Sequence, residues 1–135
     1  MEYGFFDHDA DIGLIGRGNT VEAAFVSTAE AMFSIMAEGV ELGRSHHVAF
    51  SFDEGDVELA LVTWLNRLLA EARSNGLMLC AFKLMRNGDL WQGEAWGSPW
   101  HRGAKGGVEV KGATLTMLSV KNHGDTWEAR CIVDV

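Results

Sequence analysis

Apolar residues recur at helical spacing in a first segment that is bounded by capping residues. Asn19 or Thr20 can cap this segment, Glu22 stands three residues after Asn19 as in a capping box, and Gly39 can end it. The apolar positions of the segment are Val21, Ala24, Phe25, Ala29, Met32, Phe33 and Met36. This pattern predicts a helix with a wide apolar side.

A second segment shows the same periodicity and its own end signals. Asp56 can cap it, and Asn75 and Gly76 mark its end. Its inward positions are Val57, Leu61, Trp64, Leu65, Leu68 and Ala72, and its outward ones are Glu58, Arg67, Glu71 and Arg73. A second helix is therefore expected here.

The other apolar stretches are short and predict β-strands. The expected strands cover residues 3–6, 12–15, 47–52, 77–85, 89–97, 108–120 and 126–135. Asn87-Gly88 predicts a two-residue hairpin turn, and residues 122–125 predict a second hairpin. We expect an α+β fold in which two helices pack on one face of a mostly antiparallel β-sheet.

Composition limits the class of protein. A chain of 135 residues fits one domain, residues 1–135, and its hydrophobic fraction of 47% excludes intrinsic disorder. The sequence holds no apolar run of the ~20 residues that a membrane span needs and no visible secretory signal, so we expect a soluble, cytoplasmic protein without a membrane partner. The net charge of -8 argues against direct high-affinity binding to nucleic acid and favours a basic protein or a cation as partner.

Several familiar chemistries find little support in the sequence. Gly16 and Gly18 lie between an expected strand and a helix, but the third glycine of a dinucleotide fingerprint is replaced by Val21. No nucleophile elbow, Cys-x-x-Cys pair or His-Glu-x-x-His helix occurs, and the adjacent His46 and His47 are expected at a strand edge. The two cysteines, Cys80 and Cys131, stand in apolar surroundings that favour buried, reduced thiols.

The stretch Asp7-His8-Asp9-Ala10-Asp11 holds three carboxylates and an imidazole within five positions. If strand alternation or a tight turn places the three aspartates on one side, they can converge on a hard cation such as Mg, Mn or Ca. A solvated acidic turn in which each Asp bonds its own backbone is an equally good interpretation of these residues. The sequence of the turn leaves both interpretations open.

The last residues add a carboxylate to an apolar strand. Asp134 follows Ile132 and Val133, and the terminal carboxylate of Val135 comes next. A charge in such surroundings needs a partner. A cation shared with Asp11, or a nearby lysine such as Lys111, would supply one.

Two further features suggest contact surfaces. Alternation places Glu109 and Lys111 on the same side of their segment. The two residues either form an exposed charge pattern or belong to a site. Trp91 and Trp96 face opposite ways, so at least one of them is a candidate protein-contact residue.

Four segments together resemble the archease family, in the same order and at similar spacing across the chain. They are His8-Asp9-Ala10-Asp11-Ile12-Gly13, Trp64-Leu65-Asn66-Arg67-Leu68-Leu69, Val110-Lys111-Gly112-Ala113-Thr114 and Ile132-Val133-Asp134-Val135. The resemblance implies a divalent cation (Ca, Mg or Mn) at Asp11 and Asp134 with Lys111 close by. It also implies a non-enzymatic role as accessory protein of the GTP-dependent RtcB-type RNA ligase, promoting ligase guanylylation and multiple turnover in tRNA splicing or RNA repair.

The chain departs from the family pattern at two places. Asp9 stands where the family often has Thr, which adds an oxygen donor. Leu115 and Thr116 stand where Tyr and His are common, so a ligase contact made by those residues would be weakened or made differently here.

The leading hypothesis from the sequence is therefore a cytoplasmic ligase activator. Its cation would be held by Asp11 and Asp134, with His8, Asp9 and the carboxylate of Val135 as further ligands. Two alternatives remain: a small hydrolase that uses the same carboxylates to activate water, and a chaperone-like protein-binding module whose tryptophans form the contact surface.

Overall fold

The computed structural model describes residues 2–38, 40–100 and 106–135. It contains two helices, α1 (Val21–Ala37) and α2 (Val57–Asn75). The strands are β1 (Glu2–His8), β2 (Asp11–Gly18), β3 (His46–Asp53), β4 (Leu77–Asn87), β5 (Leu90–Pro99), β6 (Gly112–Ala113), β7 (Ser119–His123) and β8 (Thr126–Asp134). No helix in these ranges is long and apolar enough to cross a membrane.

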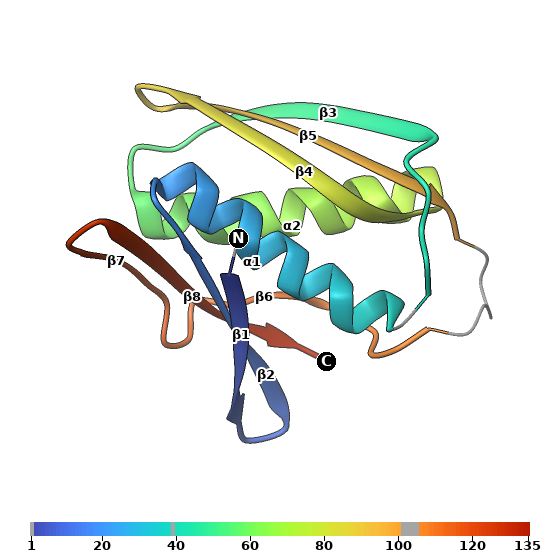
Figure 1. Ribbon diagram of the computed structural model, residues 1–135, viewed down its shortest axis with the longest axis horizontal. Coiled ribbons are helices and arrows are strands. Elements are labelled where there is room, and N and C mark those ends of the chain that lie inside the picture. The colour runs from blue at the N-terminus through green and yellow to red at the C-terminus, as the bar shows by residue number, and fades with distance from the viewer. Residues whose placement is uncertain (1, 39, 101–105) are drawn as a thin grey trace.

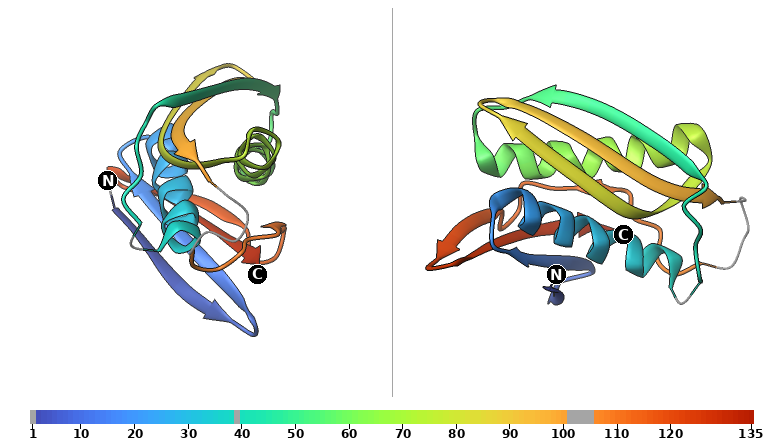
Figure 2. Two further views of the ribbon diagram at one scale, coloured as in Figure 1. Left: turned by 90° about the vertical axis from the view of Figure 1, so that its right-hand side faces the viewer. Right: turned by 45° about the horizontal axis from the view of Figure 1, so that its top comes forward.

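The strands form two antiparallel sheets with the helices between them. The larger sheet has the order β1-β2-β8-β6, with β7 also pairing with β8, and the smaller sheet has the order β3-β5-β4. Helix α1 contacts β2 of the larger sheet and β4 of the smaller one, whereas α2 contacts β4 and β6. Figures 1 and 2 show both helices enclosed between the two sheets.

The α+β class and the two expected helices are confirmed, but the strands divide between two sheets instead of forming one. The reason lies in α1, which is buried on several sides. Neighbouring residues such as Phe25 and Val26, or Ala31 and Met32, are all buried, so one sheet could not cover the helix.

The helix ends follow the expected capping chemistry. Thr20 is the N-cap of α1 and accepts a 3.0 Å hydrogen bond from the N–H of Ala23. Asp56 caps α2 through the N–H groups of Glu58 and Leu59, and Gly76 ends that helix in the left-handed conformation at φ +62°. Helix α1 ends at Ala37, and the expected stop at Gly39 lies outside the described residues.

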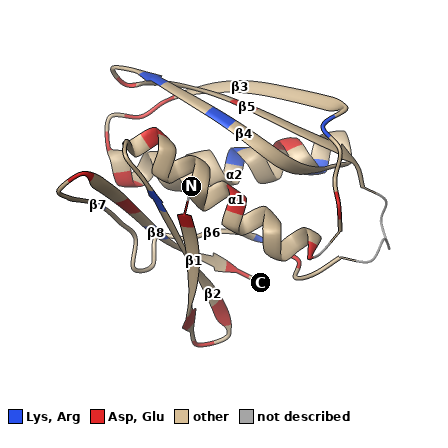
Figure 3. Cartoon of the chain, in the orientation of Figure 1, with Lys and Arg blue, Asp and Glu red and all other residues tan. Residues whose placement is uncertain are grey.

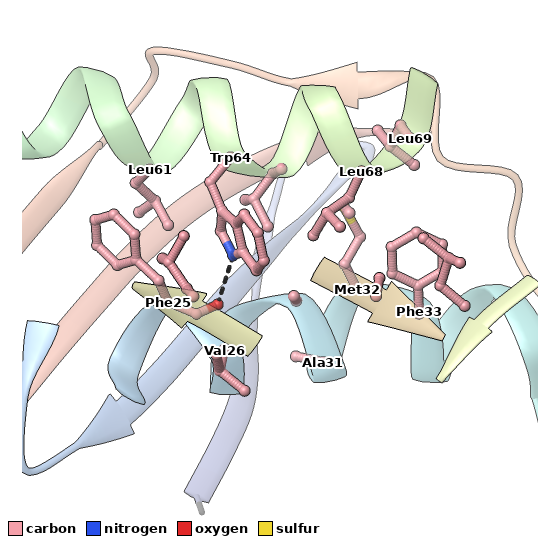
Figure 4. Packing of buried hydrophobic residues seen from close by; sticks show 14 of the residues in the cluster. Phe25, Val26, Ala31, Met32, Phe33, Leu61, Trp64, Leu68 and Leu69 are labelled. Carbon is pink, nitrogen blue, oxygen red and sulfur yellow. Dashed lines mark hydrogen bonds between the residues drawn. The ribbon is translucent and has the colours of Figure 1, made fainter. Parts of the chain in front are cut away.

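Aromatic side chains join the two helices at the centre of the core. Trp64 of α2 is fully buried, and its indole N–H donates a 2.9 Å hydrogen bond to the carbonyl of Phe25 in α1 (Figure 4). Trp91 is also fully buried and stacks on Phe25 with ring centroids 5.4 Å apart. Trp91 and Trp96 lie on opposite faces of β5, as expected, but Trp96 is half-buried against His47 and not exposed.

Two expectations about the strands were wrong. The turn of the β4–β5 hairpin is Gly88-Asp89, one residue later than expected, because Asn87 pairs with Leu90 and only Gly88 takes a positive φ. Residues 108–120 do not form one strand, and only β6 and the start of β7 are extended there. The N–H groups of Gly107 and Val108 instead donate to the last carbonyls of α1, which no local sequence pattern could indicate.

Candidate functional site

The acidic turn joins β1 to β2 as a tight hairpin. His8 pairs with Asp11, and the two residues between them form the turn, with Asp9 at φ +51°. An Asp tolerates this left-handed conformation better than most side chains do. The backbone geometry of the turn is therefore enough to explain why an Asp stands at position 9.

The hairpin places the aspartates on different faces, contrary to the expectation that three of them share one side. Asp7 pairs with Ile12, whereas His8 pairs with Asp11. Directly opposite residues of an antiparallel pair project from the same face, and adjacent residues project from opposite faces. Asp7 therefore belongs to the face that carries Ile12, and Asp11 belongs to the other face with His8.

The larger sheet brings the two ends of the chain together. Ile12 of β2 pairs with Val133 of β8, so Asp11 and Asp134 are the next residues on these two neighbouring strands. Residues at such positions have Cβ atoms about 4.5–5.5 Å apart. His8 of β1 pairs with Asp11, and Gly112 of β6 pairs with Asp134, so these residues form one row across four strands. In Figure 3 the β1–β2 turn and the end of β8 are both acidic. We call His8, Asp11 and Asp134 the acidic row.

The carboxylates of the acidic row lack protein partners. Within residues 2–38, 40–100 and 106–135, neither Asp11 nor Asp134 has a side-chain hydrogen bond or ion pair. The Nδ1 atom of His8 is buried without a hydrogen-bond partner in the same ranges and lies 3.8 Å from the Asp9 carboxylate. Like charges facing each other across two strands are destabilising, so this row favours a cation or a donor from outside the chain.

The charges farther along the same face are paired, in contrast to the acidic row. Arg17 bonds Glu2 at 2.9 Å and Glu128 at 3.0 Å, and Arg130 bonds Glu128 at 2.8 Å. The hydrogen bond from Arg130, together with that from Arg17, holds the pKa of Glu128 below its ordinary value. On this face of the sheet, the paired carboxylates of Glu2 and Glu128 therefore contrast with the unpaired carboxylates of Asp11 and Asp134.

Lys111 reaches the acidic row through its backbone. Its N–H donates a 2.8 Å hydrogen bond to the carbonyl of Asp134, and its side chain is exposed. Glu109 is also exposed, whereas Val110 between them is fully buried. Among the described residues Lys111 forms no ion pair, so its ammonium group is open to a partner.

Two residues of α2 hold this segment in place, and sequence reasoning missed their role. Asn66 accepts a 2.8 Å hydrogen bond from the N–H of Ala113, and the Arg73 guanidinium donates to the carbonyls of Val110 and Lys111. Asn66 lies in the Trp64–Leu69 segment, where an amide in a helix interior is unfavourable unless it has a specific bond to make. This unfavourable position of an amide was the only feature of the sequence that could have indicated the role of Asn66.

The donor set meets part of what a divalent cation requires. Hard cations prefer oxygen ligands, and Asp11 and Asp134 supply two neighbouring carboxylates. No group of three or more His, Cys, Asp or Glu side chains in the part of the chain that the structure describes is arranged to hold a metal ion. Val135 is half-buried against the core, and Asp9 is exposed at the turn. A cation here would take its remaining ligands from water, the terminal carboxylate or a partner.

The other candidates fall outside this site. Gly16 is required by packing, because a side chain there would clash with the backbone and hydroxyl of Thr28 in α1. His46 and His47 lie at the start of β3, an edge strand, and His47 bonds Glu94 at 3.0 Å. Cys80 and Cys131 are free thiols.

Comparison with known proteins agrees with this architecture. The model of the Archease protein family (MTH1598/TM1083) matches residues 3–135. The protein archease of Sulfolobus acidocaldarius is 30% identical over 97% of this chain and 96% of its own length, and that of Pyrococcus furiosus is 27% identical over 96% of each.

Solved structures show the same fold. The solution structure of protein 1598 from Methanobacterium thermoautotrophicum superposes with a TM-score of 0.82 at 25% identity and covers 98% of both chains. The crystal structure of an archease described as a possible chaperone, from Thermotoga maritima, gives a TM-score of 0.66 at 20% identity, covering 96% of this chain and 94% of that one. With a family match over almost the whole chain, this protein belongs to the archease family.

Proposed function

We propose that this protein is a non-enzymatic activator of a GTP-dependent RtcB-type RNA ligase, acting through the acidic row. Its role would be to promote guanylylation of the ligase and multiple turnover in tRNA splicing or RNA repair. The observation that carries the proposal is the register of the larger sheet, which sets Asp11 beside Asp134 with no protein partner for either carboxylate. Membership of the archease family supports it.

Charge complementarity supplies the physical basis of docking. The chain has a net charge of -8, and the hairpin turn and the end of β8 add carboxylates at one end of the larger sheet. A cleft that binds GTP and RNA is basic, so long-range attraction would steer this end of the protein into it. Lys111 and Glu109, both exposed beside the row, would then contact the ligase directly.

A divalent cation would complete the site. Asp11 and Asp134 would hold Ca, Mg or Mn, with Asp9, His8 and the carboxylate of Val135 as further ligands. The cation would relieve the repulsion between the carboxylates and offer an open coordination position to a phosphate of the partner. Binding of this kind can favour one state of the ligase, since ~1.4 kcal/mol changes an equilibrium tenfold.

The experiment is multiple-turnover RNA joining by the RtcB-type ligase with and without this protein. Asp11→Asn, Asp134→Asn and Lys111→Gln should each reduce stimulation, because each removes one charge from the site. Asp7→Asn is the matched control, since it removes the same charge from the same hairpin on the other face of the sheet. Full stimulation by all three site variants, or equal loss with Asp7→Asn, would refute the proposal.

A direct test of the cation uses terbium luminescence and calorimetry with Ca, Mg and Mn on the isolated protein. The parent should bind one ion, and Asp11→Asn or Asp134→Asn should weaken binding at least tenfold. Asp7→Asn should bind like the parent. Identical titrations for the parent and both row variants would exclude this site.

A chaperone-like binding role is a second candidate, favoured by one specific observation. Leu115 and Met117 are 65% and 59% exposed in the loop between β6 and β7, and Met117 has φ +50°. Exposed apolar loop residues are typical of protein contacts. A protein with this role should suppress the aggregation of client proteins. If suppression is lost in a Leu115→Ser, Met117→Ser variant but kept in Asp134→Asn, the result would support this role over the cation-dependent one.

A further inference from the structure

The outer edge of β1 is an open pairing surface. β1 is the terminal strand of the larger sheet and pairs only with β2 among the described residues. It runs for seven residues in unbroken register, and its sequence, Glu-Tyr-Gly-Phe-Phe-Asp-His, contains neither lysine nor proline. Natural proteins use such residues, other charged side chains or bulges to keep edge strands from pairing, and of these features β1 has only the acidic side chains of Glu2 and Asp7 near its ends.

Edge strands of the smaller sheet are better protected. The carbonyl of Ser51 in β3 accepts a hydrogen bond from Arg67. Strand β4 has a register shift between Leu79 and Ala81 and carries Lys83. The edges of the smaller sheet therefore do not share the open character of β1.

The register identifies the backbone groups that are free. The two-residue turn makes His8 and Asp11 a hydrogen-bonded pair, and such pairs alternate along an antiparallel ladder. The N–H and C=O groups of Tyr3, Phe5 and Asp7 consequently point away from β2. These three residues are exposed, and the rings of Tyr3 and Phe5 meet edge to face at 5.8 Å.

We propose that the free edge of β1 pairs antiparallel with β1 of a second copy of this chain, about a two-fold axis at Phe5. Phe5 then faces Phe5 of the second copy, and Tyr3 faces its Asp7. These are the residues whose backbone groups are free, so three pairs exchange two hydrogen bonds each and the sheet continues through both copies.

Self-complementarity of the strand selects a second copy over another partner. The two-fold axis sets an aromatic pair at its centre and places a tyrosine hydroxyl, which can donate, opposite each Asp7 carboxylate. On the other face it sets Gly4 opposite Phe6, whose ring lies over Gly13 of its own β2, so no bulky side chains collide there. No carboxylate faces another, even though each chain has a net charge of -8.

One strand pair buries less surface than the roughly 1,200 Å² typical of stable interfaces, so the dimer should exchange with monomer in a concentration-dependent way. Sedimentation of the full chain should show the average mass rising from 14.8 kDa toward twice that value as concentration increases. A mass that stays at the monomer value up to ~1 mM would overturn the proposal.

Charge exchange at Phe5 tests the two-fold axis. Phe5→Glu and Phe5→Lys should each be monomeric, since like charges then meet at the axis, and an equimolar mixture should recover association as a heterodimer. Leu59→Glu is the control, because Leu59 is 41% exposed on α2, much as Phe5 is 44% exposed on β1. Thermal unfolding verifies that each variant is folded. If the mixture stays monomeric, or Leu59→Glu also dissociates the dimer, the proposed axis is wrong.

Discussion

The backbone N–H of Lys111 donates a 2.8 Å hydrogen bond to the carbonyl oxygen of Asp134. This bond joins two segments of the chain through main-chain atoms alone. The Lys111 side chain is exposed and contributes nothing to the link. Position 111 therefore allows the effect of a charge to be separated from the effect of local structure.

Lys111→Gln should leave stability within ~0.5 kcal/mol of the parent, as is usual for an exposed side chain without partners, while it reduces ligase stimulation. Lys111→Pro should lower the free energy of unfolding by ~1 kcal/mol or more, because proline has no N–H for Asp134. Urea unfolding of both variants measures the difference. If Gln destabilises as much as Pro, the side chain has a structural role.

Trp64→Phe should destabilise the protein by about 2–4 kcal/mol. The substitution leaves a cavity at a fully buried position and deprives the carbonyl of Phe25 of its hydrogen bond from the indole N–H. Trp96→Phe removes the same atoms from a half-buried side chain and should cost less than ~1 kcal/mol. Urea unfolding measures the loss of stability in each variant. Equal losses would contradict a special role for the hydrogen bond between Trp64 and Phe25 shown in Figure 4.

The elements that local chemistry specifies were predictable from the sequence. Asp56 and Gly76 mark the ends of α2 because a cap and a left-handed residue act within one helical turn. The segment around Val110 was not predictable, since Arg73, 37 residues away, and the end of α1 determine its path. Local periodicity contains no information about such distant hydrogen bonds.

The sequence predicted that Asp11 and Asp134 lie close together, but not the geometry around them. The apolar setting of Asp134 indicated a partner for its charge, and the register does set it beside Asp11. The turn, however, sends Asp7 to the opposite face, because register depends on which residue closes the hairpin. Asn66 was missed, since its partner, Ala113, is 47 residues away.

Gly16→Ala should destabilise the protein by about 1–3 kcal/mol or prevent folding. A Cβ at this position would overlap the backbone of α1 at Ala24 and Thr28, and backbone atoms cannot move aside cheaply. Gly4→Ala is the matched control on the neighbouring strand, where no atom lies within 4 Å of the added carbon. Thermal unfolding at low protein concentration should show Gly4→Ala within ~0.5 kcal/mol of the parent; a similar loss for both would point to backbone conformation instead of packing.

Cys131 should resist thiol reagents in the folded protein, whereas the half-buried Cys80 should react. Burial raises the pKa of the Cys131 thiol from 9.0 to about 12. At pH 8 the fraction of reactive thiolate is then about a thousandfold lower than at an unperturbed cysteine. Labelling followed by mass spectrometry should find one modified thiol in the native parent and in Cys131→Ala, and none in Cys80→Ser before denaturant is added. Rapid native labelling of Cys80→Ser would contradict the burial.

The same pKa predicts how stability changes at high pH. The unfolded chain releases the Cys131 proton near pH 9, but the folded chain keeps it to about pH 12. The stability associated with this thiol is therefore complete below pH 9 and is lost as pH rises toward 12, by on the order of 1 kcal/mol at pH 10. Cys131→Ala begins less stable, because it removes a buried sulfur, but should decline less steeply between pH 9 and 11. Parallel stability curves for parent and variant over that range would show that the thiol ionises equally in the folded and unfolded chains.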